Sequence, residues 1–69
     1  MYKYEIIIHW SREDNCFIAT VPELPGCMAD GETQEDVLKN VNTVISEWLE
    51  TAEILGRDIP EPHENSVYV

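Results

Sequence analysis

Residues 21–36 constrain this chain of 69 residues more than any other stretch, because they hold two prolines, two glycines and a helix start. Pro22 and Pro25 lack the backbone N–H that a strand uses for pairing, so they predict that the preceding strand ends just before them. Gly26 and Gly31 are expected to take the positive φ angle that tight turns require. The stretch therefore turns the chain sharply and separates a strand region from a helix.

One long helix is predicted to follow, over residues 34–55. Thr33 suits its N-cap because the hydroxyl can accept a hydrogen bond from the backbone N–H of Asp36, and Gly56 suits the position just after its end. Apolar residues at three- and four-residue steps predict one buried stripe: Val37, Leu38, Val41, Val44, Ile45, Trp48, Leu49, Ala52 and Leu55. Acidic residues and Ile54 are predicted on the opposite, exposed side, where Ile54 is either an isolated exposed residue or part of an interface rim.

Three strands are predicted before the helix, at residues 2–10, 16–21 and 26–30. Polar and apolar residues alternate in the first two, so each strand has one face for the core. The predicted face of the first strand comprises Tyr2, Tyr4, Ile6, Ile8 and Trp10. One helix covers only one face of such a sheet, so the face with Ile7 and Ile18 is expected to self-associate or to dock a partner.

The segment after the helix is predicted to form a proline-stiffened arm over residues 57–63, anchored by Ile59, and a short last strand at residues 67–69. That strand can pair within the same sheet or with a neighbouring subunit. The predicted fold class is α+β: an antiparallel β-β-β-α-β sheet of three or four strands with one long helix packed on one face. We expect a single domain over residues 1–69.

The charge is strongly acidic, with a formal net charge of −10 from four basic and fourteen acidic residues. Such a chain repels phosphate, so direct binding of nucleic acid by this chain alone is not expected. The charge attracts a basic partner, and it also keeps a small protein soluble. Because a domain of this size buries a small core, a homo-oligomer (dimer or tetramer) is expected. No apolar run approaches the roughly 20 residues of a membrane span and no signal peptide is recognisable, so a cytoplasmic protein without membrane contact is expected.

Two kinds of metal chemistry can be weighed against simpler roles. A zinc site would draw on His9, Cys16, Cys27 and His63. Their spacing matches no zinc motif, and both cysteines are expected to be buried free thiols. A magnesium-dependent nuclease would draw on Asp14, Asp30 and Asp36. Each aspartate has a simpler place in a turn, a strand end or a helix cap, so the chain is predicted to be neither an enzyme nor a cofactor protein.

A family resemblance rests on the Pro-Glu-Leu-Pro-Gly-Cys sequence at residues 22–27 and on the residues that follow it: Ala29, Gly31, Thr33, Glu35 and Asp36. These residues resemble the core signature of the HicB family, the antitoxins of bacterial HicA–HicB toxin–antitoxin pairs. The likeness extends over nearly the whole chain, through the strand at residues 4–10, Trp48, Leu49, Gly56 and the Ile59-Pro60 pair. It implies a truncated ribonuclease H fold that lacks the catalytic set.

The resemblance also implies a function. HicB-type domains bind a small basic mRNA-cleaving toxin and cover its active-site histidine, so a HicA-type toxin is the expected partner. The acidic balance makes five exposed acids candidate contacts: Glu23, Asp30, Glu32, Glu47 and Glu50. An orphan oligomeric regulatory or binding module without a toxin partner is the open alternative. Many family members carry a C-terminal DNA-binding segment, and none is expected here.

Overall fold

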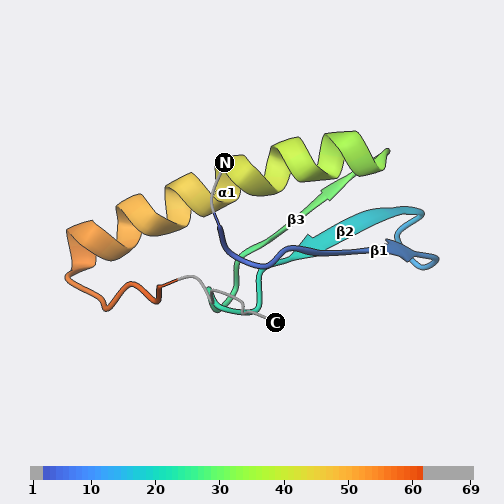
Figure 1. Ribbon diagram of the computed structural model, residues 1–69. Coiled ribbons are helices and arrows are strands. Elements are labelled where there is room, and N and C mark those ends of the chain that lie inside the picture. The colour runs from blue at the N-terminus through green and yellow to red at the C-terminus, as the bar shows by residue number, and fades with distance from the viewer. Residues whose placement is uncertain (1–2, 62–69) are drawn as a thin grey trace.

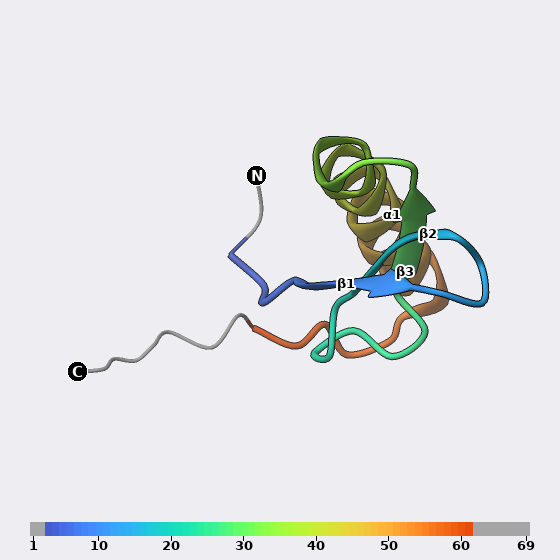
Figure 2. The same cartoon turned by 90° about the vertical axis from the view of Figure 1, so that its right-hand side faces the viewer.

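The computed structural model describes residues 3–61 as three strands followed by one helix. The elements are β1 (Ile7–Ser11), β2 (Cys16–Thr20), β3 (Met28–Gly31) and α1 (Gln34–Leu55). The strands form an antiparallel sheet in the order β1-β2-β3, and α1 crosses one face of it (Figures 1 and 2). The α+β prediction is confirmed. The predicted last strand at residues 67–69, His63 and the predicted strand start at Tyr2 lie outside the described residues.

The strand register separates the two faces of the sheet. The side chains that point away from α1 form two rows across the three strands: Ile7–Thr20–Met28 and His9–Ile18–Asp30. The alternate row, which contains Ala19, points toward α1, because successive side chains of a strand lie on opposite faces. Ala19 is fully buried, whereas Ile7 and Met28 are exposed. We call the face that points away from α1 the open face.

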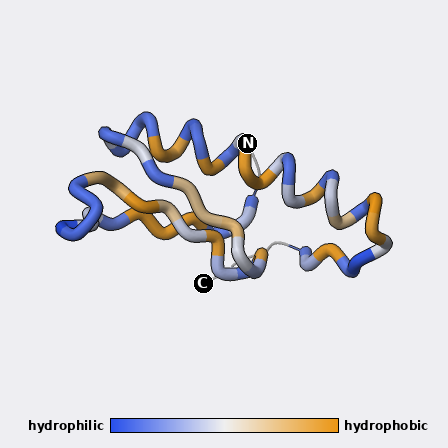
Figure 3. Tube along the Cα trace, turned by 180° about the vertical axis from the view of Figure 1, so that it is seen from behind, coloured by the Kyte–Doolittle hydropathy of each residue, from blue (hydrophilic) through white to orange (hydrophobic). Residues whose placement is uncertain are grey.

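The core lies between α1 and the sheet. Its buried side chains are Tyr4, Ala19, Val21, Leu24, Cys27, Val37, Val41 and Ile45. Figure 3 shows apolar segments recurring along the helix among polar ones, as expected for an element with one buried side. We call residues 22–27 the proline–glycine turn. Leu24 in this turn is completely buried, so the turn forms part of the core.

The helix bounds agree with the prediction because local chemistry sets them. The Thr33 hydroxyl accepts a 3.0 Å hydrogen bond from the backbone N–H of Asp36. Gly56 has φ of 69°, and the next residue, Arg57, donates its backbone N–H to the carbonyl of Ala52 at 2.8 Å. These bonds satisfy backbone groups that a helix end would otherwise leave unpaired.

The first and third strands begin later than predicted. β1 starts at Ile7 because its partner there, Thr20, is the last residue of β2, and Pro22 follows soon after. β3 starts at Met28 because both backbone groups of Cys27 serve the turn, the N–H donating to Leu24 and the carbonyl accepting from Val21. The turn thus uses the backbone groups that would have extended the sheet.

Gly31 has a different role from the one predicted. Gly26 takes a positive φ of 78° as expected, but Gly31 does not take one. A Cβ atom at Gly31 would lie 2.6 Å from the backbone nitrogen of Val37. Position 31 therefore requires glycine because the strand approaches the first helical turn closely.

Three positions predicted to be buried are exposed. Trp10, on the predicted core face of the first strand, is 46% exposed because α1 lies mainly over β3 and β2, and its ring packs edge-on against Phe17 with 4.9 Å between the ring centroids. Leu55 is 64% exposed, because the helix of 22 residues extends well past strands of four or five residues. Ile59, the predicted anchor of the arm, is 39% exposed. The arm is held instead by the Tyr4 hydroxyl, which donates to the carbonyl of Pro60.

Candidate partner-binding surface

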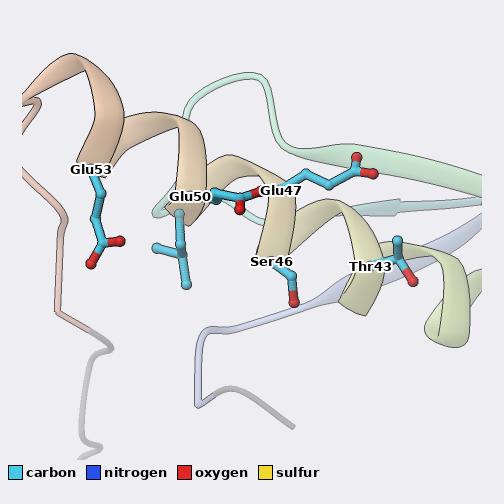
Figure 4. A pocket seen from close by; sticks show the side chains of 6 residues that line it. Thr43, Ser46, Glu47, Glu50 and Glu53 are labelled. Atoms are coloured by element: carbon cyan, nitrogen blue, oxygen red, sulfur yellow. The ribbon is translucent and has the colours of Figure 1, made fainter.

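The outer side of α1 carries a row of three carboxylates. Glu47, Glu50 and Glu53 are exposed and lie three residues apart, so they share one side of the helix. Together with Thr43, Ser46 and Leu49 they line a shallow depression of about 510 Å³. Figure 4 shows these side chains following one another along the helix. The row gives α1 a locally negative surface.

An exposed apolar side chain lies beside this row. Ile54 is 77% exposed and follows Glu50 by four residues, which places it on the same side of the helix. We call Glu47, Glu50, Glu53 and Ile54 the acidic surface. Carboxylates can receive lysine or arginine side chains of a partner, and an apolar residue among them supplies contact area. The arrangement is suited to docking a basic protein.

The other predicted contacts lie elsewhere. Asp30 is exposed on the open face, and its backbone carbonyl accepts from the Asn40 side chain at 2.9 Å. Glu32 is exposed between β3 and α1. Glu23 is half-buried in the proline–glycine turn, where its Oε1 accepts the backbone N–H of Glu5 at 2.8 Å. Of the five candidates, the fold therefore brings Glu47 and Glu50 together on the outer side of the helix.

Glu53 and Ile54 extend the surface beyond the candidates predicted from the sequence. The spacing of Glu53 after Glu50 is a signal that was available in the sequence. The exposure of Ile54 follows from its position opposite the buried stripe and was predicted, with an isolated exposed residue and an interface rim as the two alternatives. Leu55 enlarges the apolar area at this end of the helix.

No metal centre forms in the part of the chain that the structure describes. Within residues 3–61, no group of three or more histidine, cysteine, aspartate or glutamate side chains could hold a metal ion. Cys27 is buried as predicted, whereas Cys16 is half-buried on the open face. Burial raises the pKa of both thiols, and the charges of Asp30 and Asp14 add to the rise at Cys16. Neither thiol is activated as a nucleophile.

Over residues 3–61, no helix combines the length and the apolar character that a membrane span requires.

Relatives of known sequence cover most of the chain. A UPF0150 protein of Synechocystis sp. is 40% identical over 57 residues, which are 83% of this chain and 77% of the relative. A UPF0150 protein of Thermoplasma acidophilum is 31% identical over 67 residues, which are 97% of this chain and 96% of the relative. A second Synechocystis UPF0150 protein is 36% identical over 55 residues, 78% of this chain and 80% of the relative. No solved structure is significantly similar to the chain.

The family comparison agrees with the resemblance seen in the residues. The family described as the HicB-like antitoxin of bacterial toxin–antitoxin systems matches residues 4–68. The match includes the proline–glycine turn, all three strands and α1. The UPF0150 relatives are of the same family. The chain therefore belongs to the HicB-like antitoxin family.

Proposed function

We propose that this chain is the antitoxin of a type II toxin–antitoxin system and that it binds and neutralises a small basic HicA-type mRNA-cleaving toxin. The observation that carries the proposal is the family match over residues 4–68. The net charge of −10 and the acidic surface on α1 support it, because a toxin that binds RNA must present basic side chains to phosphate.

Neutralisation is proposed to work by occlusion. The carboxylates of Glu47, Glu50 and Glu53 compete with RNA phosphates for the basic surface of the toxin, and the bound domain blocks access to its active site. Long-range attraction between opposite charges speeds the encounter and is screened by salt. The complex is therefore expected to form more slowly as ionic strength rises.

The acidic surface is our first assignment for the toxin contact. It unites Glu47 and Glu50 from the predicted set with two neighbours on the same side of the helix. Asp30 and Glu32 form a second, separate candidate site. Glu23 is the weakest candidate because its carboxylate already binds the backbone of Glu5.

The proposal includes several further properties of the chain. It acts in the cytoplasm, where mRNA is cleaved, as a single domain without catalysis or a cofactor. It does not bind nucleic acid directly, because its net charge repels phosphate.

The functional test is RNA cleavage by the small basic protein encoded next to this gene, measured with and without an equimolar amount of the chain. We expect inhibition together with a stable complex on gel filtration. Undiminished cleavage, or the absence of such a neighbouring gene, would favour the orphan oligomeric module instead.

The contact assignment has its own test. A triple variant, E47K/E50K/E53K, should weaken toxin binding by at least about tenfold, because each reversal replaces an attraction with a repulsion. The matched control, E5K/E13K/D58K, makes the same change in net charge at exposed positions elsewhere. Equal weakening by both variants would show that overall charge, and not this surface, controls binding. Loss of binding in D30K/E32K alone would move the contact to the second site.

A further inference from the structure

The open face of the sheet differs from the rest of this acidic molecule. Its two rows of paired residues contain a single carboxylate, that of Asp30. Ile7 is 46% exposed and Met28 is 54% exposed. A depression of about 570 Å³ lies on this face, lined by Ile18, Thr20 and Met28 among others and bordered by Asp14. Among residues 3–61, no helix or strand covers it (Figures 1 and 2).

The register makes the open face self-complementary. Two copies can stack open face to open face, related by a two-fold axis that runs parallel to β2. In this arrangement β1 of one copy lies over β3 of the other, and residues at the same level along the strands face each other. Under this rotation Ile7 meets Met28 of the second copy, and His9 meets Asp30. Ile18 and Thr20 meet their own equivalents. Apolar residues thus face apolar residues, and an imidazole faces a carboxylate.

His9 and Asp30 have no competing side-chain partner in their own chain. Within residues 3–61, neither the His9 ring nor the Asp30 carboxylate makes a hydrogen bond or an ion pair. Their strands are separated by β2, so they lie two strand spacings apart, roughly 10 Å. An imidazole N–H of a second copy can donate to the carboxylate from across the interface.

We propose that the open face is the interface of a homodimer with its two-fold axis along β2. The inference goes beyond the proposed toxin binding and does not depend on it, because the acidic surface lies on the outer side of α1. A homo-oligomer is expected from the chain length alone, and the geometry now assigns it a surface.

A second copy fits this face better than a basic partner does. Two chains of charge −10 repel each other over most of their surfaces, and the open face is where a copy can approach with few carboxylates opposed. A strongly basic partner would find more carboxylates on the outer side of α1. The sheet is small, about 15 Å by 17 Å from standard strand dimensions. An interface of this size is below the standard class, so we expect a weak dimer that forms only at high protein concentration.

Sedimentation equilibrium from about 1 µM to about 1 mM, a range that covers weak association, tests the proposal on the full chain. The wild type should change from monomer to dimer as concentration rises. M28E should stay monomeric throughout, because it opposes a carboxylate to Ile7 of the other copy. The matched control, I54E, adds the same charge at another exposed apolar residue and should dimerise like the wild type. Thermal melting at low concentration checks that both variants fold.

A charge exchange tests the register of the interface. H9D places an aspartate opposite Asp30 of the second copy and should weaken dimerisation several-fold. The double variant H9D/D30H restores the pair with its members exchanged and should recover most of the loss. Failure of the double variant to recover would overturn the proposed axis.

Cys16 supplies a probe of the same axis. It lies on β2 and points to the open face, so its equivalents in the two copies come close to each other, while Cys27 is buried. A short bismaleimide should link the dimer covalently through Cys16, and C16S should abolish the link. A wild type that remains monomeric at the highest concentration, or a dimer unaffected by M28E, would overturn the proposal.

Discussion

The indole N–H of Trp48 donates a 2.9 Å hydrogen bond to the backbone carbonyl of Pro25 and so ties the second half of α1 to the proline–glycine turn. The guanidinium of Arg57 lies over the same indole, 5.5 Å from the ring centroid. Leu24, next to Pro25, is completely buried. The helix, the turn and the start of the arm are therefore linked through one half-buried tryptophan.

Replacing Trp48 tests this link. W48F keeps most of the apolar contact and loses the hydrogen bond, so it should lower the free energy of unfolding by about 1 kcal/mol. W48A also loses the packed ring and should cost about 3 kcal/mol, at the low end for an aromatic truncation because the ring is only half-buried. Urea denaturation followed by circular dichroism measures both values.

R57A is the control for the stacked cation. It should cost less than about 1 kcal/mol, because the interaction is close to solvent. If W48A unfolds at the same urea concentration as the wild type, the assigned packing of the helix is wrong.

Features set by neighbouring residues were predictable from the sequence. Thr33 and Gly56 mark the helix ends through bonds to residues three to five positions away, and both bounds were predicted correctly. The role of Gly31 was not predictable, because it depends on how closely β3 approaches Val37. The exposure of Leu55 was also missed, because periodicity along a helix does not indicate where the sheet beneath it ends.

The same distinction applies to the candidate surface. Glu47 and Glu50 lie on one helix, so spacing alone places them together. Glu23 is an exposed acid by its sequence context, yet its carboxylate binds the backbone of Glu5, 18 positions away. Asp30 lies on the open face of the sheet, away from α1 and its acidic surface, and only the strand register reveals this. Contacts distant in sequence therefore limited the prediction.

Gly31 gives a sharp stability prediction. G31A should lower the free energy of unfolding by about 1–3 kcal/mol, because the added Cβ meets backbone atoms of Val37 that cannot move independently. G56A meets no atom within 4 Å and is strained only by its positive φ, so about 1 kcal/mol is expected there. Thermal unfolding of the two variants compares the cost of the steric clash at residue 31 with the cost of the positive φ at residue 56. A G31A variant as stable as the wild type would show that strand and helix are further apart.

The N-cap provides a second local test. T33A removes the hydroxyl that accepts from Asp36 and should cost about 1 kcal/mol. T33S keeps an equivalent hydroxyl and should cost far less. Helix content by circular dichroism and the urea midpoint distinguish the two variants. Equal stability of T33A and T33S would show that the cap contributes nothing.

Tyr4 predicts how stability responds to alkaline pH. Burial raises the pKa of its hydroxyl, and the nearby charges of Glu23 and Glu61 raise it further. In the unfolded chain the hydroxyl ionises near pH 10, so above that pH the unfolded state binds fewer protons than the folded state. The stability that Tyr4 contributes is therefore complete below about pH 10 and falls as the pH rises through the folded pKa.

Urea unfolding of the wild type and Y4F between about pH 8 and about pH 11 measures this effect, since the range brackets the ionisation of a free tyrosine. Y4F also loses the hydrogen bond to the Pro60 carbonyl, so it should be less stable at pH 8 by about 1 kcal/mol. Above pH 10 the gap between the two proteins should narrow, because the wild type alone must keep Tyr4 protonated in order to fold. The thiols of Cys16 and Cys27 also have raised pKa values, so their ionisation in the unfolded chain lowers the stability of both proteins at alkaline pH. Because both proteins contain the two thiols, the difference in stability between wild type and Y4F is unaffected. A gap that stays constant across this range would show that Tyr4 ionises equally easily in the folded and unfolded states.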